Sequence, residues 1–325
     1  MKKFLSIAMI ALLVFTLAAC TDEASETESA QEETAETQEE EEEVVEEALV
    51  IETLKVQITP SKDAARLDAQ RKPLQDMLEE KLAMPVEVSI GTDYSATIEA
   101  MRSGQIHVGF LAPTQYVLAH GQDAADVILK SLRYDVDDNG DKLEDAPLVD
   151  NFRSQLVAAT DSPINSVQDL KGKTIAVASF TSTSGFVWPA NLLADSGLDP
   201  QADVEWVNVG GHDLAIQAVY NGETDAAFTF KDARFVLKEE HPDVYDKVRF
   251  VLDTEGIPND TISVIPQMDQ ELRDRIADAF LSIVDEEEGL EVFRLIYEWE
   301  GFAKAQDSDY DIVRTYLQRQ EEWDF

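Results

Sequence analysis

The chain has 325 residues, and its 66 acidic side chains outnumber 26 basic ones, for a formal net charge of −40 at pH 7. So acidic a chain is a poor partner for nucleic acid, whose phosphates repel it. Cys20 is its one cysteine, which excludes a disulfide framework and a CxxC metal site.

The first 20 residues are typical of a secretory signal. Lys2 and Lys3 precede an apolar run at 4–19, and small residues lead up to Cys20. This run is shorter than the roughly 20 residues that a membrane-spanning helix needs. The junction resembles that of bacterial lipoproteins. We therefore predict a signal peptide at 1–19 and lipidation of Cys20, which anchors the protein outside the cytoplasm, on the outer face of the cell membrane.

The segment 20–52 is predicted to be a disordered tether. Its residues from Thr21 onward include 15 acidic and no basic side chains, so it has no apolar face to bury and is extended by self-repulsion. The residues 53–325 carry 51 acidic and 24 basic side chains. This charge does not exclude an anionic ligand, because salt screens exposed charges beyond about 8 Å and local groups govern a closed pocket.

Residues 53–132 show a first alternation of strand and helix patterns. Pro73 is expected to open a second helical segment within the first helix. The predicted strands are 54–59, 86–90, 106–111 and 127–132, and the predicted helices are 64–82, 95–102 and one that begins at Pro113.

The segment 135–150 interrupts this alternation. The run from Asp135 to Gly140 resembles the opening of a calcium loop, but Ala146 stands where a bidentate Glu is needed. An Asn139-Gly140 turn at a hairpin tip is the simpler interpretation. Both interpretations stay open.

A second alternation follows, and the chain ends in three amphipathic helices. The predicted strands are 152–159, 174–178, 204–209, 225–230 and 248–252, and the predicted helices are 166–170, 186–194, 214–220, 269–284, 289–299 and 310–319. The two series predict an α/β fold with two lobes, each a mostly parallel sheet flanked by helices, with a hinge between them. We expect the chain to cross between lobes near 152–159 and 251–255, which gives one lobe 53–153 plus 254–325 and the other 154–253.

A hydroxyl-rich turn, Ser182-Thr183-Ser184-Gly185, is the feature around which the chain is organised. It follows a buried strand and precedes a helix, where free N–H groups and the helix dipole attract anions. An ordinary Ser/Thr helix cap is the alternative. Tyr94, His212 and Asp260 also fall at ends of strands or starts of helices, so we expect all of them to face one cleft.

An enzyme is the first rival class. Ser184, His212 and Asp232 resemble the members of a catalytic triad, but the G-x-S-x-G elbow is absent. The other histidines, His107, His120 and His241, lack the spacing of metal ligands. The sequence therefore predicts a binding protein with no enzymatic activity, no cofactor and no metal site.

Several segments together resemble the substrate-binding proteins of phosphonate, phosphite and phosphate ABC importers. These segments are Asp93-Tyr94, Arg102-Ser103-Gly104-Gln105-Ile106, Ser182-Thr183-Ser184-Gly185 with Pro189, Gly211-His212-Asp213, Asn221-Gly222-Glu223-Thr224-Asp225-Ala226, Asp232-Ala233-Arg234 and Ile257-Pro258-Asn259-Asp260. The resemblance implies a two-lobed periplasmic-binding-protein-like fold of type II, a phosphorus oxyanion as ligand, and an ABC permease with its ATPase as partners. We expect a monomer. A receptor for another small anion or a vitamin precursor, or a sensor, is the alternative.

The resemblance also implies roles for individual residues. Ser182, Thr183, Ser184 and His212 donate to the oxyanion, and Tyr94 donates from the other lobe. Asp232 and Asp260 accept from an amine or a protonated P–OH of the ligand. Phe152 stands where better-known members have a ligand-facing Tyr, and Tyr116 is the candidate to supply the missing hydroxyl. The same resemblance leaves the preferred phosphorus oxyanion open.

Overall fold

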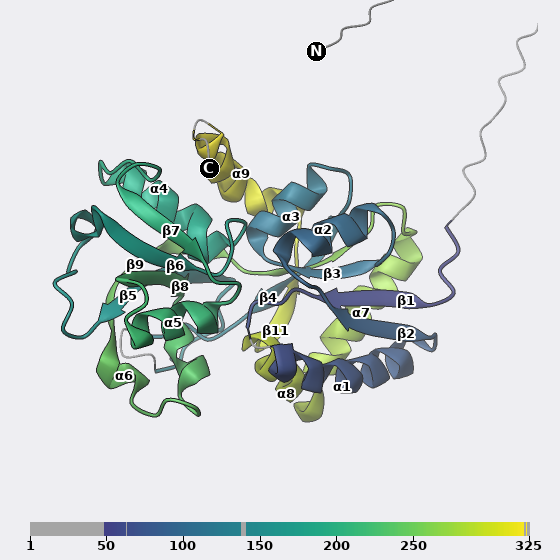
Figure 1. Cartoon of the computed structure of the whole chain (residues 1–325). Helices are drawn as coiled ribbons and strands as arrows, with labels where there is room; N and C mark the ends of the chain where they lie inside the picture. Colours follow the sequence, from purple (N-terminus) through teal and green to yellow (C-terminus); the bar gives the residue numbers. More distant parts are fainter. Residues whose placement is uncertain (1–48, 63, 138–140, 322, 324–325) are drawn as a thin grey trace, which may run out of the picture. The chain divides into compact units, whose positions relative to one another are not determined.

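The computed structural model describes residues 49–325 except 63, 138–140, 322, 324 and 325. Two β-sheets with helices against their faces make up this part of the chain (Figure 1). Among the described residues we find no helix with the length and apolar character that a membrane span requires. The predicted signal peptide, Cys20 and most of the tether lie outside the described residues.

The first sheet has six strands in the order β11-β4-β10-β3-β1-β2. Its strands are β1 (Leu54–Ile58), β2 (Val86–Ile90), β3 (Val108–Leu111), β4 (Asp126–Leu132), β10 (Thr261–Val264) and β11 (Gly301–Lys304). The helices of this part are α1 (Ala64–Leu82), α2 (Tyr94–Arg102), α3 (Pro113–His120), α7 (Gln270–Val284), α8 (Glu287–Tyr297), the short η4 (Asp307–Tyr310) and α9 (Asp311–Gln320).

The second sheet has five strands in the order β7-β6-β8-β5-β9. Its strands are β5 (Asn151–Ala159), β6 (Lys173–Val177), β7 (Val204–Asn208), β8 (Ala226–Phe230) and β9 (Val248–Pro258). The helices of this part are η1 (Val167–Leu170), the π-helical turn η2 (Thr183–Val187), α4 (Trp188–Asp195), α5 (His212–Asn221), η3 (Ala233–Leu237) and α6 (Val244–Lys247).

Both sheets are mixed, whereas the strand-helix alternation predicts mostly parallel ones. In the first sheet β1 runs parallel to β2 and β3, but β10 is antiparallel to β3 and β4, and β11 is antiparallel to β4. In the second sheet β6 runs parallel to β7 and β8, but β5 is antiparallel to β8 and β9. The difference arises because the chain leaves and re-enters the first sheet, and the returning strands run in the opposite direction.

The chain crosses between the sheets at two places, after β4 and after β9. Because β5 and β9 belong wholly to the second sheet, the crossings lie at 133–150 and 259–260. The bounds expected from the sequence, 153/154 and 253/254, fall a few residues inside these two strands. Asn259 ties the crossings together, since its buried side-chain amide donates to the carbonyl oxygens of Ser131 (2.8 Å) and Val149 (3.1 Å).

Alternating side chains give the second sheet two buried faces. Val157 of β5 packs with residues of α5 such as Ile216 and Val219, while its neighbours Leu156 and Ala158 pack on the other face with Leu193 of α4. The helices therefore cover opposite sides of the sheet, as Figure 1 shows for α4 and α5. A two-residue period produces this arrangement because successive side chains of a strand point to opposite faces.

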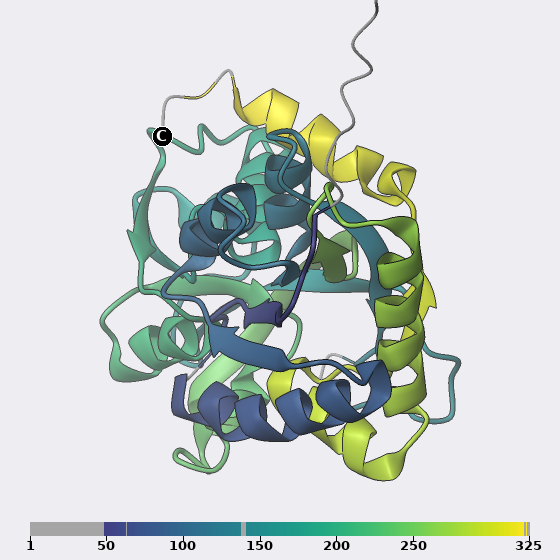
Figure 2. The same ribbon diagram turned by 90° about the vertical axis from the view of Figure 1, so that its right-hand side faces the viewer.

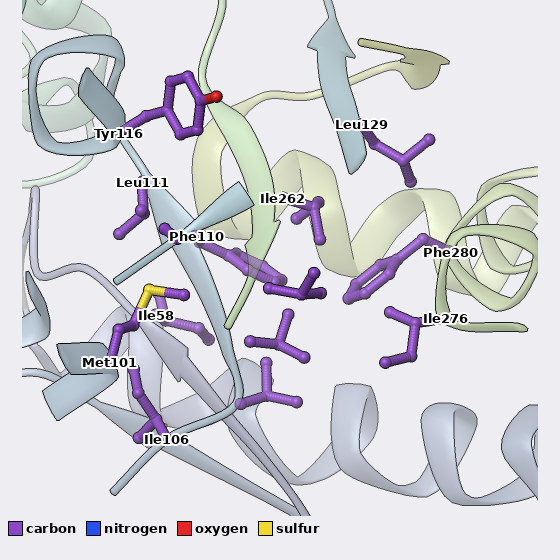
Figure 3. Close-up of a cluster of buried hydrophobic side chains, with 14 of the residues drawn as sticks. Ile58, Met101, Ile106, Phe110, Leu111, Tyr116, Leu129, Ile262, Ile276 and Phe280 are labelled. Atoms are coloured by element: carbon purple, nitrogen blue, oxygen red, sulfur yellow. The ribbon is translucent and has the colours of Figure 1, made fainter. Parts of the chain in front are cut away.

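The core of the first part is built around Phe110 of β3. Its ring lies 5.7 Å from that of Phe280 on α7 and 5.5 Å from that of Trp299, between centroids. Figure 3 shows Phe110, Ile262 and Phe280 within this cluster of buried side chains. Helices α1 and α7 both pack beside this sheet and against each other; in Figure 2, α1 runs along the bottom of the view and α7 along its right-hand side. This core fixes the strand ends from which the candidate site is built.

The structure places most of the predicted elements within a few residues and differs in the details of others. Pro73 lies inside a single helix α1 rather than opening a second one, because Leu67, Leu74 and Leu78 are all fully buried and hold the helix on both sides of the proline. Strand β11, which the sequence analysis did not predict, extends the first sheet. The segment after β4 forms antiparallel bridges between Arg133 and Val149 and between Val136 and Lys142, as in a hairpin whose tip lies outside the described residues.

We predict that Gly289→Ala lowers the free energy of unfolding by about 1–3 kcal/mol, because overpacking a closed contact forces neighbouring groups apart. A Cβ at Gly289 in α8 would lie 2.1 Å from the backbone oxygen of Ile283, in the last turn of α7. Gly301→Ala is the control, because its Cβ would meet its nearest neighbours at 3.8 Å. Urea denaturation measures both variants. Equal stability of the two would contradict the close packing of α7 and α8.

Candidate ligand-binding site

A cavity of about 60 Å³ lies where strand ends and helix starts from both parts of the chain meet. The residues that line it are Thr59, Ser61, Lys62, Tyr94, Phe110, Leu111, Ala112, Gln115, Arg133, Phe152, Ser182, Thr183, Ser184, His212, Phe230, Asp260, Tyr297 and Glu298. Seven of these are residues that the sequence analysis selected. They converge because they stand at or next to the ends of strands and the starts of helices.

Helix N-termini surround this cavity. Tyr94 begins α2, Ala112 is the N-cap of α3, Ser182 is the N-cap of η2, and His212 begins α5. Each start presents N–H groups that have no partner within the helix, and the helix dipole gives it partial positive charge. This convergence favours an anion despite the acidity of the whole chain.

The Ser182–Ser184 turn is held in place by bonds on both sides. Ser182 Oγ accepts from the backbone N–H of Gly185 (3.1 Å), and the carbonyl oxygen of Ser184 accepts from Ser154 Oγ (2.6 Å). A Cβ at Gly185 would come 2.9 Å from Ser182 Oγ, so this position needs glycine. All three hydroxyl residues are at least 97% buried. The turn is thus a rigid, desolvated set of donors rather than a surface cap.

Thr183 connects the two parts of the chain across the cavity wall. Its Oγ1 accepts from the backbone N–H of Thr114 on α3 (3.0 Å) and donates to Thr114 Oγ1 (2.9 Å). The backbone N–H of His212 likewise donates to the carbonyl oxygen of Ser61 (3.1 Å). These bonds join elements of the first sheet directly to elements of the second.

His212 is a neutral donor-acceptor in this wall. Its side chain is buried, its Nε2 lies 3.4 Å from Ser182 Oγ, and its ring packs edge-on against Phe230. Burial, aided by the charge of Lys62, lowers the pKa of His212 to about 3. Its Nδ1 has no hydrogen-bond partner among the described residues. A neutral imidazole with one unsatisfied ring nitrogen is suited to a polar ligand atom.

Tyr94 supplies a hydroxyl from the first part of the chain. Burial, together with the nearby charge of Asp260, raises the pKa of Tyr94 well above its usual value, so the phenol stays protonated. The residue is only 4% exposed and lines the cavity with its neighbour Ser182. It can therefore donate to an oxyanion without carrying a charge into the site.

Two ion pairs complete the wall, and sequence reasoning missed three of their four members. Arg133 Nη2 donates to Asp260 Oδ2 (3.0 Å), and Lys62 Nζ donates to Glu298 Oε1 (2.7 Å). Trp299 Nε1 also donates to Asp260 Oδ2 (3.4 Å). The only sequence signal for Arg133 is its place directly after a strand, where the predicted alternation breaks off.

Two candidates from the sequence do not line the cavity. Tyr116 is fully buried and its hydroxyl donates to Asp307 (2.6 Å), so it does not replace the hydroxyl that Phe152 lacks. Asp232 accepts from the hydroxyl of Tyr245 (3.0 Å), and burial raises the pKa of its carboxyl to about 7. Both side chains are satisfied by neighbours within their own part of the chain, which local sequence does not reveal.

A triad is not assembled either. Ser184 and His212 both line the cavity, but the carboxylate of Asp232 is bonded to Tyr245, and the hydroxyl nearest His212 is that of Ser182. Within the described residues no group of three His, Cys, Asp or Glu side chains is arranged to hold a metal ion. The geometry suits hydrogen bonding by neutral donors to an anion.

Residues 56–310 match the model of a protein family described as periplasmic substrate-binding proteins of phosphonate ABC transporters. The chain belongs to this family. It is 27% identical to a phosphate-import protein, PhnD, of Mycolicibacterium smegmatis over 78% of this chain and 82% of that protein. It is 25% identical to a phosphonates-binding periplasmic protein of Escherichia coli, over 64% of this chain and 59% of that one.

Solved structures show the same fold for this substrate-binding protein. A binding component of an ABC phosphonate transporter from Pseudomonas aeruginosa matches with a TM-score of 0.71 at 18% identity, over 83% of this chain and 86% of that one. PhnD1 of Prochlorococcus marinus, solved with methylphosphonate, matches with a TM-score of 0.71 at 17% identity, over 83% and 98% of the two chains. The two-lobed α/β fold predicted from the sequence is thereby confirmed, and so is the predicted family. Membership also places the protein outside the cytoplasm.

Proposed function

We propose that this substrate-binding protein captures a phosphorus oxyanion in the cavity between its two sheets. The observation that carries the proposal is the convergence of helix starts and neutral donors, namely Tyr94, the Ser182–Ser184 turn and His212, on one cavity. Hydrogen bonds to an oxyanion are roughly twice as strong as those between neutral groups. Neutral donors also avoid the cost of burying unpaired cations. Relatives whose names include phosphate, phosphonates and methylphosphonate support this ligand class.

The two lobes close over the ligand by a hinge motion in this proposal. The crossings at 133–150 and 259–260 form the hinge, and the Thr183–Thr114 and His212–Ser61 bonds form on closure. The closed form is then presented to an ABC permease and its ATPase, and no reaction is catalysed. We further propose that the protein is a monomer held at the membrane by a lipid on Cys20, with the acidic segment 20–52 as spacer.

Calorimetric titration of the purified protein tests the ligand class. The panel is phosphite, phosphate, methylphosphonate and 2-aminoethylphosphonate, with methanesulfonate as a control of similar shape and lower charge. We expect at least one phosphorus oxyanion to bind at least about tenfold more tightly than methanesulfonate, because charge-assisted bonds scale with the charge of the acceptor. Absence of binding by all four phosphorus compounds would overturn the proposal and favour a receptor for another small molecule.

Tyr94→Phe is expected to weaken binding of the preferred oxyanion about 3–10-fold, the loss of one net hydrogen bond. Tyr116→Phe is the matched control, because it removes a phenolic hydroxyl that bonds Asp307 outside the cavity. The control should keep the affinity of the unmodified protein. Equal losses of affinity in the two variants would show that the hydroxyl of Tyr94 does not contact the ligand. The same titration measures both variants.

A further inference from the structure

Arg133 and Asp260 pair in the wall of the cavity, on the two segments that cross between the sheets. They are 127 positions apart in the chain, yet Arg133 Nη2 lies 3.0 Å from Asp260 Oδ2, and both side chains are mostly buried. Asp260 is the carboxylate that the sequence analysis expected to receive an amine of the ligand. In the structure this carboxylate already has a cation beside it.

Arg133 also forms part of a partition within the protein. Its guanidinium lies 4.9 Å from the ring centroid of Phe152, in the geometry of a cation–π contact. A second cavity of about 40 Å³ shares Arg133, Phe152, Phe230 and Glu298 with the first one. These four residues therefore stand between the two cavities. A ligand substituent directed toward the second cavity would meet this partition.

One N–H donor of the Arg133 guanidinium is not used by the residues that the structure describes. Its Nε is buried and has no hydrogen-bond partner within the described part of the chain. The other carboxylate in the wall, Glu298, is paired with Lys62 at 2.7 Å. Both carboxylates of the cavity are thus neutralised by cations that line it as well. The wall offers an unsatisfied N–H donor and no unpaired carboxylate.

These contacts work against a ligand that carries an ammonium group. Such a group reaches Asp260 only by displacing Arg133, which leaves a buried guanidinium without its partner and next to a second cation. If Arg133 stays, the ammonium group meets a like charge at short range in a desolvated site. An uncharged substituent meets neither penalty.

We propose that Arg133 is a specificity-determining residue that makes this site reject aminoalkylphosphonates and select phosphorus oxyanions with no cationic substituent. The inference rests on the proposed function and adds a substrate class to it. Arg133 acts by its charge, through the pair with Asp260. It makes Asp260 a wall residue of the cavity instead of a receptor for an amine.

Two ligands of the same shape allow the effect of a substituent's charge to be measured apart from the effect of its size. Propylphosphonate and 2-aminoethylphosphonate differ in one terminal group, a methyl against an ammonium. Calorimetric titration of the unmodified protein should give an affinity for 2-aminoethylphosphonate at least about tenfold below that for propylphosphonate, the difference that one unfavourable buried charge produces. Equal or tighter binding of the amine would overturn the inference, and methylphosphonate binding in the same experiment shows separately that the proposed function holds.

The variant Arg133→Met tests the assigned residue by a gain of binding, which misfolding does not produce. Methionine keeps most of the length and removes the charge, so the affinity for 2-aminoethylphosphonate relative to propylphosphonate should rise at least about tenfold. The double variant Arg133→Met with Asp260→Asn should lose this gain, because the freed carboxylate is absent. An equal rise for both ligands in Arg133→Met would mean that Arg133 acts by size and would overturn the inference.

Discussion

Thr183→Val should weaken binding of the preferred phosphorus oxyanion about 10–100-fold, because two buried partner groups on Thr114 lose their bond. The Thr183 hydroxyl accepts from the N–H and donates to the hydroxyl of Thr114, and it lies in the wall of the cavity. Valine has nearly the same shape, so packing is preserved. The loss therefore reports on the bonds that hold the two lobes together, and not on a cavity left by a smaller side chain. Calorimetric titration measures the affinity.

Thr114→Val provides the control for this prediction. It removes one of the two bonds and leaves the Thr114 N–H in place, so its effect should be smaller. The double variant should bind no more weakly than Thr183→Val alone, since the two hydroxyls act as one pair. Additive losses would mean that the two residues act separately. Unchanged affinity in Thr183→Val would show that the Thr183–Thr114 bond between the lobes does not contribute to ligand binding.

His212 should make the folded protein less stable in acid. Burial lowers the pKa of His212 to about 3, whereas in the unfolded chain it is about 6.5. As the pH falls below 6.5, the imidazole of His212 takes up a proton in the unfolded chain. In the folded protein it stays neutral until the pH approaches 3. The contribution of His212 to the free energy of unfolding is therefore fully present above about pH 6.5. It decreases by about 1.4 kcal/mol per pH unit between pH 6 and pH 4.

Comparison with His212→Gln isolates this effect. Asp232 titrates in the same range with the opposite sign, because burial raises the pKa of its carboxyl to about 7 and the folded state then binds the proton first. The difference between the unmodified protein and the variant cancels Asp232. Urea denaturation at pH 6.5, 5.5 and 4.5 should show that this difference in the free energy of unfolding changes by about 2–3 kcal/mol between pH 6.5 and pH 4.5. Parallel stability curves would show that His212 does not resist protonation.

Local patterns were sufficient for the order of strands and helices and for much of the candidate site. Tyr94, the Ser182–Ser184 turn and His212 each begin a helix or cap one after a strand, and strand ends of an α/β fold gather at one edge. Their meeting at one cavity therefore follows from their positions in the pattern. The direction of the strands did not follow, because periodicity is the same for parallel and antiparallel neighbours.

Long-range pairing set the limit of the sequence analysis. Lys62 and Glu298 are 236 positions apart, and Arg133 and Asp260 are 127 apart, so no window of sequence contains both members of a pair. Tyr116 failed as a candidate for the same reason, since its partner Asp307 is 191 positions away. Buried side chains choose partners by the tertiary fold, and a residue type alone does not identify which ones remain for a ligand.

A crystal structure of the protein grown with methylphosphonate tests the central claim most directly. The account predicts one phosphonate in the cavity, with its oxygens within hydrogen-bonding distance of the Ser182–Ser184 turn and of Tyr94, and with the Thr183–Thr114 bond intact. A phosphonate bound elsewhere, or a closed protein whose cavity holds no ligand at saturating methylphosphonate, would contradict capture of a phosphorus oxyanion between the two lobes.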